Sequence, residues 1–383
     1  MSFTQYILFI LQKTGRSLQA ALNTFFAAMG EEAGEYSKQA FSKGRLRIKP
    51  EAIRDLFSFT AQEFYSQAQY KTLSGYRVLA IDGTKLNLPN TPELAEEFGV
   101  QKSKGESQVQ ALVSGLYDVL NKIMVDVCIS SCKSDERKHA AELIRRLHQG
   151  AEAKDLIVMD RGYPSATLLH QLENNSQAYV IRCNSTFVKG MRCTGDDCTI
   201  EHRFAKMDKP LKLRVVRITL PKGTREVLVT NLPADKITLQ QLCQIYKLRW
   251  GIETNYDWIK NKLCVENFSG IGRIAVLQDF YATVFLWNLT GIMAFDLHDA
   301  IEAAHRTEHN KYEYRLNISM TISALKECVV ELVMCKSQHR SMRILRRIRK
   351  ALQKSVVAVH NDRSFPHHRK HRSLKFHNNA KAL

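Results

Sequence analysis

The sequence predicts a mixed α/β fold in which a central sheet lies between helical regions at both ends of the chain. Short apolar runs rich in β-branched residues fill the middle of the chain and are typical of strands. Segments whose apolar residues recur at helical spacing separate some of these runs. The helical period also dominates residues 1–75 and 276–335, so helical regions are expected on both sides of the sheet.

The first 75 residues are expected to form only helices. Apolar residues recur at three- and four-residue intervals from Phe3 to Leu11, and Ser2 is a suitable N-cap. Ser37 and Pro50 are start signals for two further helices. The expected helical ranges are 2–29, with a second run over 18–29, then 37–47 and 50–69.

The strands are expected after these helices. They cover 76–82, 110–118, 122–130, 155–160 and 178–183. Helices over about 135–149 and from near Pro164 fall between the last three strands, so the order β-β-β-α-β-α-β predicts a mixed sheet. Residues 184–235 alternate strand-like and turn-rich pieces and predict a mostly β insertion. Thr238 then caps a long helix that runs to about Leu263.

Composition excludes several classes of protein. Of 383 residues, 44% are hydrophobic and 25% charged, which is ordinary for a globular protein and excludes a mostly disordered chain. No apolar stretch reaches the roughly 18–20 residues of a membrane span, so no membrane partner is expected. Nine scattered cysteines suit a reducing compartment and predict no disulfide framework, which favours the cytoplasm.

The charge points to a polyanion as partner. The chain carries 56 basic and 38 acidic residues, a formal net charge of +18, and the region from Lys336 onward holds 14 of the basic residues and one acid. Nucleic acid or an anionic membrane suits such a balance. We expect the basic tail to contact DNA backbones without sequence preference, with a disordered solubilising tail as the alternative.

Two acidic residues follow apolar runs of the expected sheet. Asp82 precedes Gly83, and Asp160 precedes Arg161. A carboxylate at the end of a buried strand is costly unless it is hydrogen-bonded or holds a cation. Asp before Gly is also a common turn residue, so each aspartate alone has a plain structural interpretation.

A third carboxylate lies on the expected long helix. Its residues Tyr246, Arg249, Glu253 and Lys260 are spaced so that they share one narrow face. A solvated face with a Glu/Arg pair four residues apart is the plain alternative. Together with the two aspartates, Glu253 would suit two Mg²⁺ ions that clamp the attacking and leaving oxygens of phosphoryl transfer. The basic side chains and the tyrosine hydroxyl would then face a nucleic-acid backbone.

Three segments resemble the insertion-sequence-four family of bacterial DDE transposases. They are IDGT (81–84), MDRGY (159–163) and YKLRWGIETNYDWIK (246–260), and the last matches the family's Tyr-x2-Arg-x3-Glu-x6-Lys signature. The resemblance covers about residues 5–290 and implies an RNase H-like catalytic core. It implies Asp82, Asp160 and Glu253 as the triad that binds two Mg²⁺ ions, with Mn²⁺ as a substitute. It makes Tyr246, Arg249 and Lys260 catalytic residues that contact phosphates at the transposon end.

The resemblance also implies a reaction and its partners. Water hydrolyses the phosphodiester at the end of the element, the freed 3′-hydroxyl attacks the opposite strand to form a hairpin, and the reopened end joins target DNA. One two-metal site can serve all of these in-line displacements. The expected protein is a cut-and-paste transposase of an insertion sequence, which binds terminal inverted repeats and target duplex as a homodimer. Its location would be the bacterial cytoplasm, on the nucleoid.

One departure from the family concerns aromatic stacking. Relatives place a Trp in the β insertion, whereas Trp250, Trp258 and Trp287 all lie outside it. Phe187 or Phe204 could stack on a flipped base instead, since any aromatic face stacks. We expect Trp250 and Trp258 to pack the long helix against the sheet.

The N-terminal region carries a run of basic residues without acids. A helix-turn-helix-like element that docks on terminal repeats is expected, and a solvated basic helix is the alternative. The expected DNA contacts are Lys38, Lys43, Arg45 and Arg47.

These expectations give an organisation along the chain. It comprises a helical DNA-binding domain (1–75), the first part of the catalytic core (76–183), the β insertion (184–235), the Glu-bearing helix of the core (236–275), a helical region suited to dimerisation (276–335) and the basic tail (336–383). Two other functions stay open. One is a non-catalytic DNA-binding regulator derived from a transposase, and the presence of all three acidic residues argues against it. The other is a structure-selective nuclease, against which the N-terminal helical unit speaks.

Overall fold

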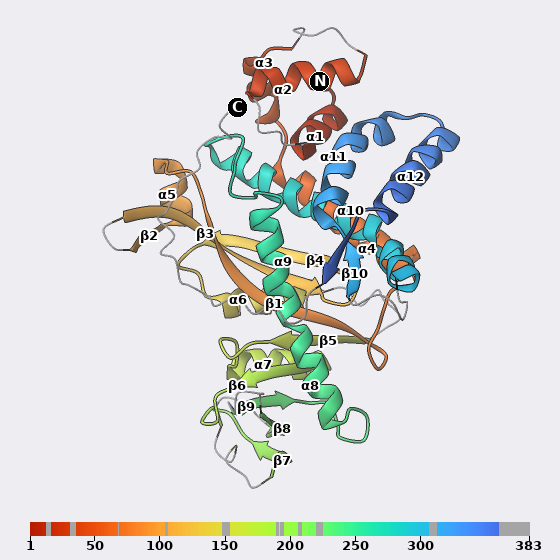
Figure 1. Ribbon diagram of the computed structural model, residues 1–383. Coiled ribbons are helices and arrows are strands. Elements are labelled where there is room, and N and C mark those ends of the chain that lie inside the picture. Colours follow the sequence, from red (N-terminus) through yellow and green to blue (C-terminus); the bar gives the residue numbers. More distant parts are fainter. Residues whose placement is uncertain are drawn as a thin grey trace. The chain divides into compact units, whose positions relative to one another are not determined.

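The structure is a computed structural model that divides the chain into two compact units (Figure 1). It describes residues 1–12, 17–30, 36–67, 69–103, 106–147, 154–188, 191, 195–205, 209–219, 225–305 and 312–359. The sheet unit comprises residues 62–86 and 111–257, and the helical unit comprises residues 1–61, 87–110 and 258–383. This grouping differs from the separate N- and C-terminal helical regions that the sequence predicts, because both fall into one unit.

A mixed sheet forms the centre of the sheet unit. Its strands are β1 (Tyr76–Asn87), β3 (Glu106–Asp118), β4 (Ile123–Ser131), β5 (Lys154–Met159), β6 (Ala178–Cys183), β7 (Asp197–His202), β8 (Leu211–Thr219) and β9 (Arg225–Thr230). They follow the order β3-β1-β5-β6-β9-β8-β7, and β4 also pairs with β3. The β1–β5 and β5–β6 pairs are parallel, whereas β6–β9, β9–β8, β8–β7 and β3–β4 are antiparallel. The expected mixed sheet is thereby confirmed.

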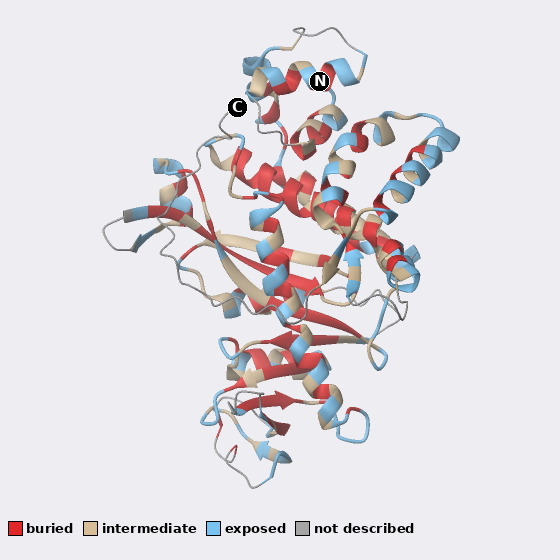
Figure 2. Ribbon diagram, viewed as in Figure 1, coloured by how far each residue is buried: buried red, intermediate tan, exposed pale blue. Residues whose placement is uncertain are grey.

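Helices cover both faces of this sheet, and its central strands are buried (Figure 2). On one face, Leu79 of β1 lies in an apolar cluster with residues of α6 (Glu136–Arg146) and α7 (Ala166–Asn174). On the other face, its neighbour Val78 clusters with residues of α8 (Leu239–Leu248). Successive strand residues therefore face opposite layers, which explains why these strands are nearly continuous apolar runs in the sequence.

The expected β insertion is strand-rich, and its strands extend the main sheet. Val180 of β6 pairs with Thr230 of β9, so the insertion continues the ladder of the core instead of standing apart. Cys198 in β7 is disulfide-bonded, which corrects the expectation that the cysteines stay reduced. The other cysteines of the described residues form no disulfide.

The expected long helix is two consecutive helices, α8 and α9 (Trp250–Asn261). The capping box at Thr238 is present, with its hydroxyl accepting the Gln241 N–H. The Arg249 N–H then bonds to the carbonyl of Tyr246, three residues back, so the α-helical ladder is interrupted at Arg249.

The helical unit joins both ends of the chain. Its helices are α1 (Phe3–Gln12), α2 (Leu18–Ala28), α3 (Lys38–Arg45), most of α4 (Pro50–Gln67), α5 (Pro92–Phe98), the end of α9, α10 (Arg273–His305), α11 (Ile318–Met334) and α12 (Gln338–Gln353). Short strands β2 (Val100–Ser103), β10 (Glu313–Leu316) and β11 (Val356–Val359) complete it, with β2 paired to the first part of β3 and β10 to β11. The sequence analysis missed α5 and β2. The second half of the expected basic tail, residues 360–383, lies outside the described residues.

The 33-residue helix α10 is long and apolar enough to cross a membrane by length and composition. Of its most apolar window, 56% is buried inside the structure, which favours a core helix. Its polar residues Gln278 and Asp279 are also buried, and both bind the guanidinium of Arg45.

Candidate active site

Asp82 and Asp160 lie at neighbouring positions of two adjacent parallel strands. Ile81 of β1 pairs with Met159 of β5, and each aspartate directly follows one member of this pair. The two carboxylates therefore come from adjacent strands of the sheet. Asp160 ends its strand as expected, whereas β1 runs on to Asn87, so Asp82 lies inside its strand.

The surroundings of Asp82 favour its protonated form. Burial raises the pKa of Asp82 to about 6, although the Gly83 N–H and the charge of Arg249 oppose the rise. The carboxylates of Glu253 and Glu136 add to it. The Gly83 N–H lies 3.0 Å from Asp82 Oδ1. Asp82 is thus a carboxylate among like charges in a partly buried place, which is where a cation is most favourable.

Asp160 is held by donors from three elements. Its Oδ1 accepts the Arg161 N–H at 2.7 Å and lies 3.4 Å from the Tyr246 hydroxyl of α8. The guanidinium of Arg182 on β6 lies 3.6 Å away and also pairs with Glu226 of β9 at 2.8 Å. With its side chain 34% exposed, Asp160 remains accessible to a ligand.

Arg249 links the third carboxylate to the first. Its side chain is 2% exposed, and its Nη1 lies 2.9 Å from Glu253 Oε1 and 3.9 Å from Asp82 Oδ2. The guanidinium also leaves Nε without a hydrogen-bond partner among the described residues. The break between α8 and α9 therefore places a buried cation between two carboxylates that come from different elements.

Three of the four residues on the expected helix face lie next to the two aspartates. Tyr246, Arg249 and Glu253 all interact within the acidic centre, which we define as Asp82, Asp160 and Glu253 with these two donors. Tyr246 and Arg249 are buried and bind carboxylates as they stand, so their contact with phosphates stays a prediction. Lys260 lies in the last turn of α9 and belongs to the helical unit, so its role also stays a prediction.

Glu136, the first residue of α6, lies beside the acidic centre and adds to the rise in the pKa of Asp82. A Cβ added at Gly83 would come within 2.9 Å of Glu136 Oε2, so glycine leaves the room that this carboxylate occupies. The buried Tyr163 hydroxyl, from the DRGY segment, donates to the same oxygen at 3.3 Å. Asp118, a further carboxylate of the sheet unit, is buried and accepts a hydrogen bond from the Tyr65 hydroxyl.

Arg182 and Glu226 were missed by the sequence analysis. Each is a charged residue within an otherwise apolar strand, in AYVIRC and REVLVT. A charge inside a buried strand is costly unless it is paired. A charged residue in such a strand was therefore the signal in the sequence that could have indicated an ion pair. The pairing itself depends on β6 lying next to β9, which the sequence did not reveal.

One expected DNA contact needs correction. Arg45 is 4% exposed, and its guanidinium pairs with Asp279 at 3.0 Å and bonds to Gln278 and Ser269. All of these partners lie inside the helical unit, so the Arg45 side chain stabilises the core of that unit and is not available to DNA. The other expected contacts, Lys38, Lys43 and Arg47, are exposed.

The expectation for Trp250 is also wrong. Its side chain is 57% exposed, with the Arg249 guanidinium 4.8 Å from the ring centroid. Trp258 packs against Trp287 of α10, with ring centroids 5.6 Å apart. The suggested substitutes Phe187 and Phe204 are half-buried and lie 5.9 Å from each other, so they pack within the insertion.

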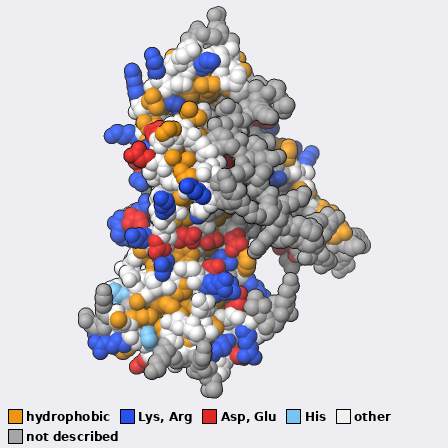
Figure 3. Space-filling view, turned by 90° about the vertical axis from the view of Figure 1, so that its left-hand side faces the viewer, with side chains coloured by type: hydrophobic (Ala, Val, Ile, Leu, Met, Phe, Trp, Pro, Cys, Tyr) orange, Lys and Arg blue, Asp and Glu red, His pale blue; other side chains and the backbone are white. Residues whose placement is uncertain are grey.

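Acidic side chains gather on one face of the molecule, with Lys and Arg side chains around them (Figure 3). Among the described residues, no group of three or more His, Cys, Asp and Glu side chains is close enough to hold a metal ion as it stands. The donor chemistry nevertheless fits a hard divalent cation, because carboxylate oxygens supply the ligands and the pKa of Asp82 is raised by burial.

The chain is similar to proteins described as transposases. A family model described as "Transposase DDE domain" matches residues 73–289. A curated relative, the transposase InsG for insertion sequence element IS4 of Escherichia coli (strain K12), is 22% identical over 238 residues, which cover 58% of this chain and 53% of that protein. The chain thus spans about half the length of this relative. A piggyBac transposase synaptic complex with hairpin DNA aligns at a TM-score of 0.44 and 11% identity, over 90% of this chain and 75% of that one.

Proposed function

Since the chain belongs to the DDE transposases of the insertion-sequence-four family, we propose that it cuts and joins DNA at the ends of an insertion sequence. The observation that carries the proposal is the meeting of Asp82 and Glu253 at one buried guanidinium, with Asp160 at the neighbouring strand position. Three carboxylates from three elements suit metal-assisted phosphoryl transfer on an RNase H-like scaffold.

Asp82, Asp160 and Glu253 would hold two Mg²⁺ ions, with Mn²⁺ as a substitute. When bound, these ions would supply charge stabilisation for the attacking and leaving oxygens. The chain's own residues do the positioning. Tyr246 orients Asp160 through a hydrogen bond, and Arg249 restrains Glu253. Both donors would contact phosphate oxygens of DNA bound beside the carboxylates.

The proposed reaction starts with hydrolysis at the end of the element and continues with attack by the freed 3′-hydroxyl. In the cut-and-paste route a hairpin forms, which requires an unpaired base to be accommodated. Trp250 supports this step, because it presents a largely exposed aromatic face beside Arg249. The substrates would be terminal inverted repeats and target duplex, and the working form a homodimer.

A non-catalytic DNA-binding regulator is the second candidate. It would keep the basic surfaces and bind ends without cutting. The ion pairs of Arg249 would then serve stability alone, because they already satisfy the carboxylates.

The deciding experiment is cleavage of a duplex that carries the terminal repeat and its flank, with Mg²⁺ or Mn²⁺. We expect a metal-dependent nick at the repeat boundary. Glu253→Gln should lose the nick while end binding stays within about twofold, because the amide keeps the size of the side chain and removes a ligand charge. Asp257→Asn, an exposed acid on the same helix, is the matched control and should cut normally. Binding without any nick by the unaltered protein would favour the regulator.

A further inference from the structure

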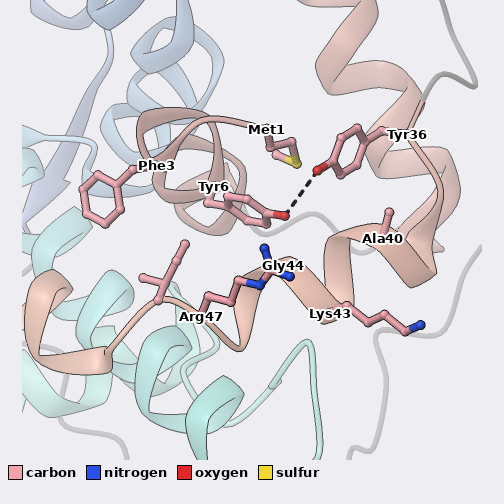
Figure 4. Close-up of a pocket in the computed structure, with 9 residues that line it drawn as sticks. Met1, Phe3, Tyr6, Tyr36, Ala40, Lys43, Gly44 and Arg47 are labelled. Carbon is pink, nitrogen blue, oxygen red and sulfur yellow. Dashed lines mark hydrogen bonds between the residues drawn. The ribbon is translucent and has the colours of Figure 1, made fainter.

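A pocket in the helical unit lies outside the acidic centre. It has a volume of about 420 Å³ and is lined by residues of α1, α3 and the segments beside them (Figure 4). The hydroxyls of Tyr6 and Tyr36 lie 3.5 Å apart and point toward one another. Arg47 reaches the same place from the turn after α3, and Lys43 lies at the rim.

The floor of this pocket is fixed by packing. Tyr6 is 6% exposed, and its ring stacks on Phe41 with centroids 5.4 Å apart. Its hydroxyl lies directly against Gly44, where any Cβ would overlap the oxygen. Glycine at this position therefore lets the hydroxyl of Tyr6 reach the pocket, and the stacking holds it there.

The hydrogen bond between the two hydroxyls uses one O–H group and leaves the other available to donate to a ligand. Burial and the hydrogen bond with Tyr36 raise the pKa of Tyr6 to about 12, so this hydroxyl keeps its proton at neutral pH. The positive charge of Arg47 acts on both tyrosines. None of the described residues that line the pocket is Asp or Glu. The pocket therefore collects donors and positive charge with no carboxylate of its own among these residues.

We propose that this pocket binds one phosphate group of the DNA backbone. A phosphate offers several acceptor oxygens to converging donors, which suits Tyr6, Tyr36 and Arg47 together. Arg47 and Lys43 are exposed and four residues apart, so an incoming strand can reach them. The inference rests on the proposed function, because it makes this pocket an anchor for DNA that is cut elsewhere.

The test measures duplex binding without divalent metal over a range of salt concentrations. Arg47→Ala should reduce the slope of log K against log[salt] by about 1, because one phosphate contact releases about one counterion. Arg47→Lys should keep most of the slope, since the charge remains. Tyr36→Phe should weaken binding several-fold with the slope unchanged, because only a neutral donor is lost. Arg54→Ala on α4, a half-exposed cation outside the pocket, is the control and should match the unaltered protein.

A second measurement uses inorganic phosphate as the probe. Phosphate at millimolar concentration should raise the melting temperature of the unaltered protein more than that of Arg47→Ala. An unchanged salt slope in Arg47→Ala would overturn the proposal, as would equal thermal shifts in the two proteins. Failure of the proposed function is seen separately. If no variant and not even the unaltered protein cuts DNA, but Arg47→Ala still lowers the salt slope, the phosphate pocket is supported and the proposed cleavage activity is rejected.

Discussion

The buried guanidinium of Arg249 donates to Glu253 Oε1 at 2.9 Å, and Glu253 lies in the first turn of the next helix. Its other contact, with Asp82, is longer at 3.9 Å. Arg249 is thus the positively charged group that links carboxylates of β1 and α9. Removing Arg249 should therefore affect both carboxylates.

Replacing Arg249 by Ala should leave Asp82 and Glu253 facing each other with no positive charge between them. We expect cleavage to fall by at least 100-fold, because the donor that reaches phosphate oxygens is lost as well. Arg249→Lys should recover little, because an ammonium cannot reproduce the planar fork. Single-turnover cleavage at saturating DNA is the measurement. A rate within threefold of the unaltered protein would contradict the assignment.

Arg45 provides a prediction about stability. Its side chain and that of Asp279 are 5% and 1% exposed, so removing the guanidinium strands a buried carboxylate. Arg45→Ala should lower the free energy of unfolding by about 3–5 kcal/mol. Urea denaturation measures this. Lys38→Ala, an exposed cation on the same helix, should change it by less than about 0.5 kcal/mol. Equal effects of the two substitutions would show that Arg45 is not a core residue.

Much of the sheet and two of its carboxylates could be predicted from the sequence. Strands such as 155–160 are buried on both faces, so their apolar runs are continuous, and Asp160 marks where such a run ends. Asp82 was placed correctly in the sheet but wrongly at a strand end, because GTKLN after it has no apolar pattern and still continues β1.

The other features of the fold and the site depend on contacts between residues that are far apart in the sequence, or on hydrogen bonding that the sequence does not show. Arg45 and Asp279 are 234 residues apart, and no local pattern distinguishes this buried arginine from its exposed neighbours Lys43 and Arg47. The interruption at Arg249 was equally invisible, since the sequence around it has helical spacing throughout and the change lies in the hydrogen bonding.

His139 should make stability depend on pH. Burial lowers the pKa of His139, and the positive charge of Arg146 adds to this effect. Its two ring nitrogens contact the hydroxyls of Ser130 and Ser114 at 2.7 and 2.9 Å. Because the folded state binds a proton less readily than the unfolded state, stability is full above the unfolded pKa of about 6.5 and falls as the pH drops below it.

The slope from this group is at most about 1.4 kcal/mol per pH unit. The difference in unfolding free energy between the unaltered protein and His139→Gln, measured from pH 7.5 to 5, isolates this contribution from the other acids. The difference should shrink as the pH falls. A difference that is constant over this range would show that His139 does not titrate differently on unfolding.

Trp250 separates the hairpin step from the first nick. Because its side chain is 57% exposed, Trp250→Ala should change the unfolding free energy by no more than about 2 kcal/mol, part of it from the lost ring contact with Arg249. If its face stacks on an unpaired base, the substitution removes about 1–3 kcal/mol from that contact, which corresponds to a roughly 5- to 150-fold loss. We expect this loss in the conversion of nicked ends to hairpins, with first-strand nicking within about threefold. Trp250→Phe should recover most of it, because a smaller aromatic face remains. Equal slowing of nicking and hairpin formation would place Trp250 in general DNA binding, and no slowing of either would exclude it as the stacking residue.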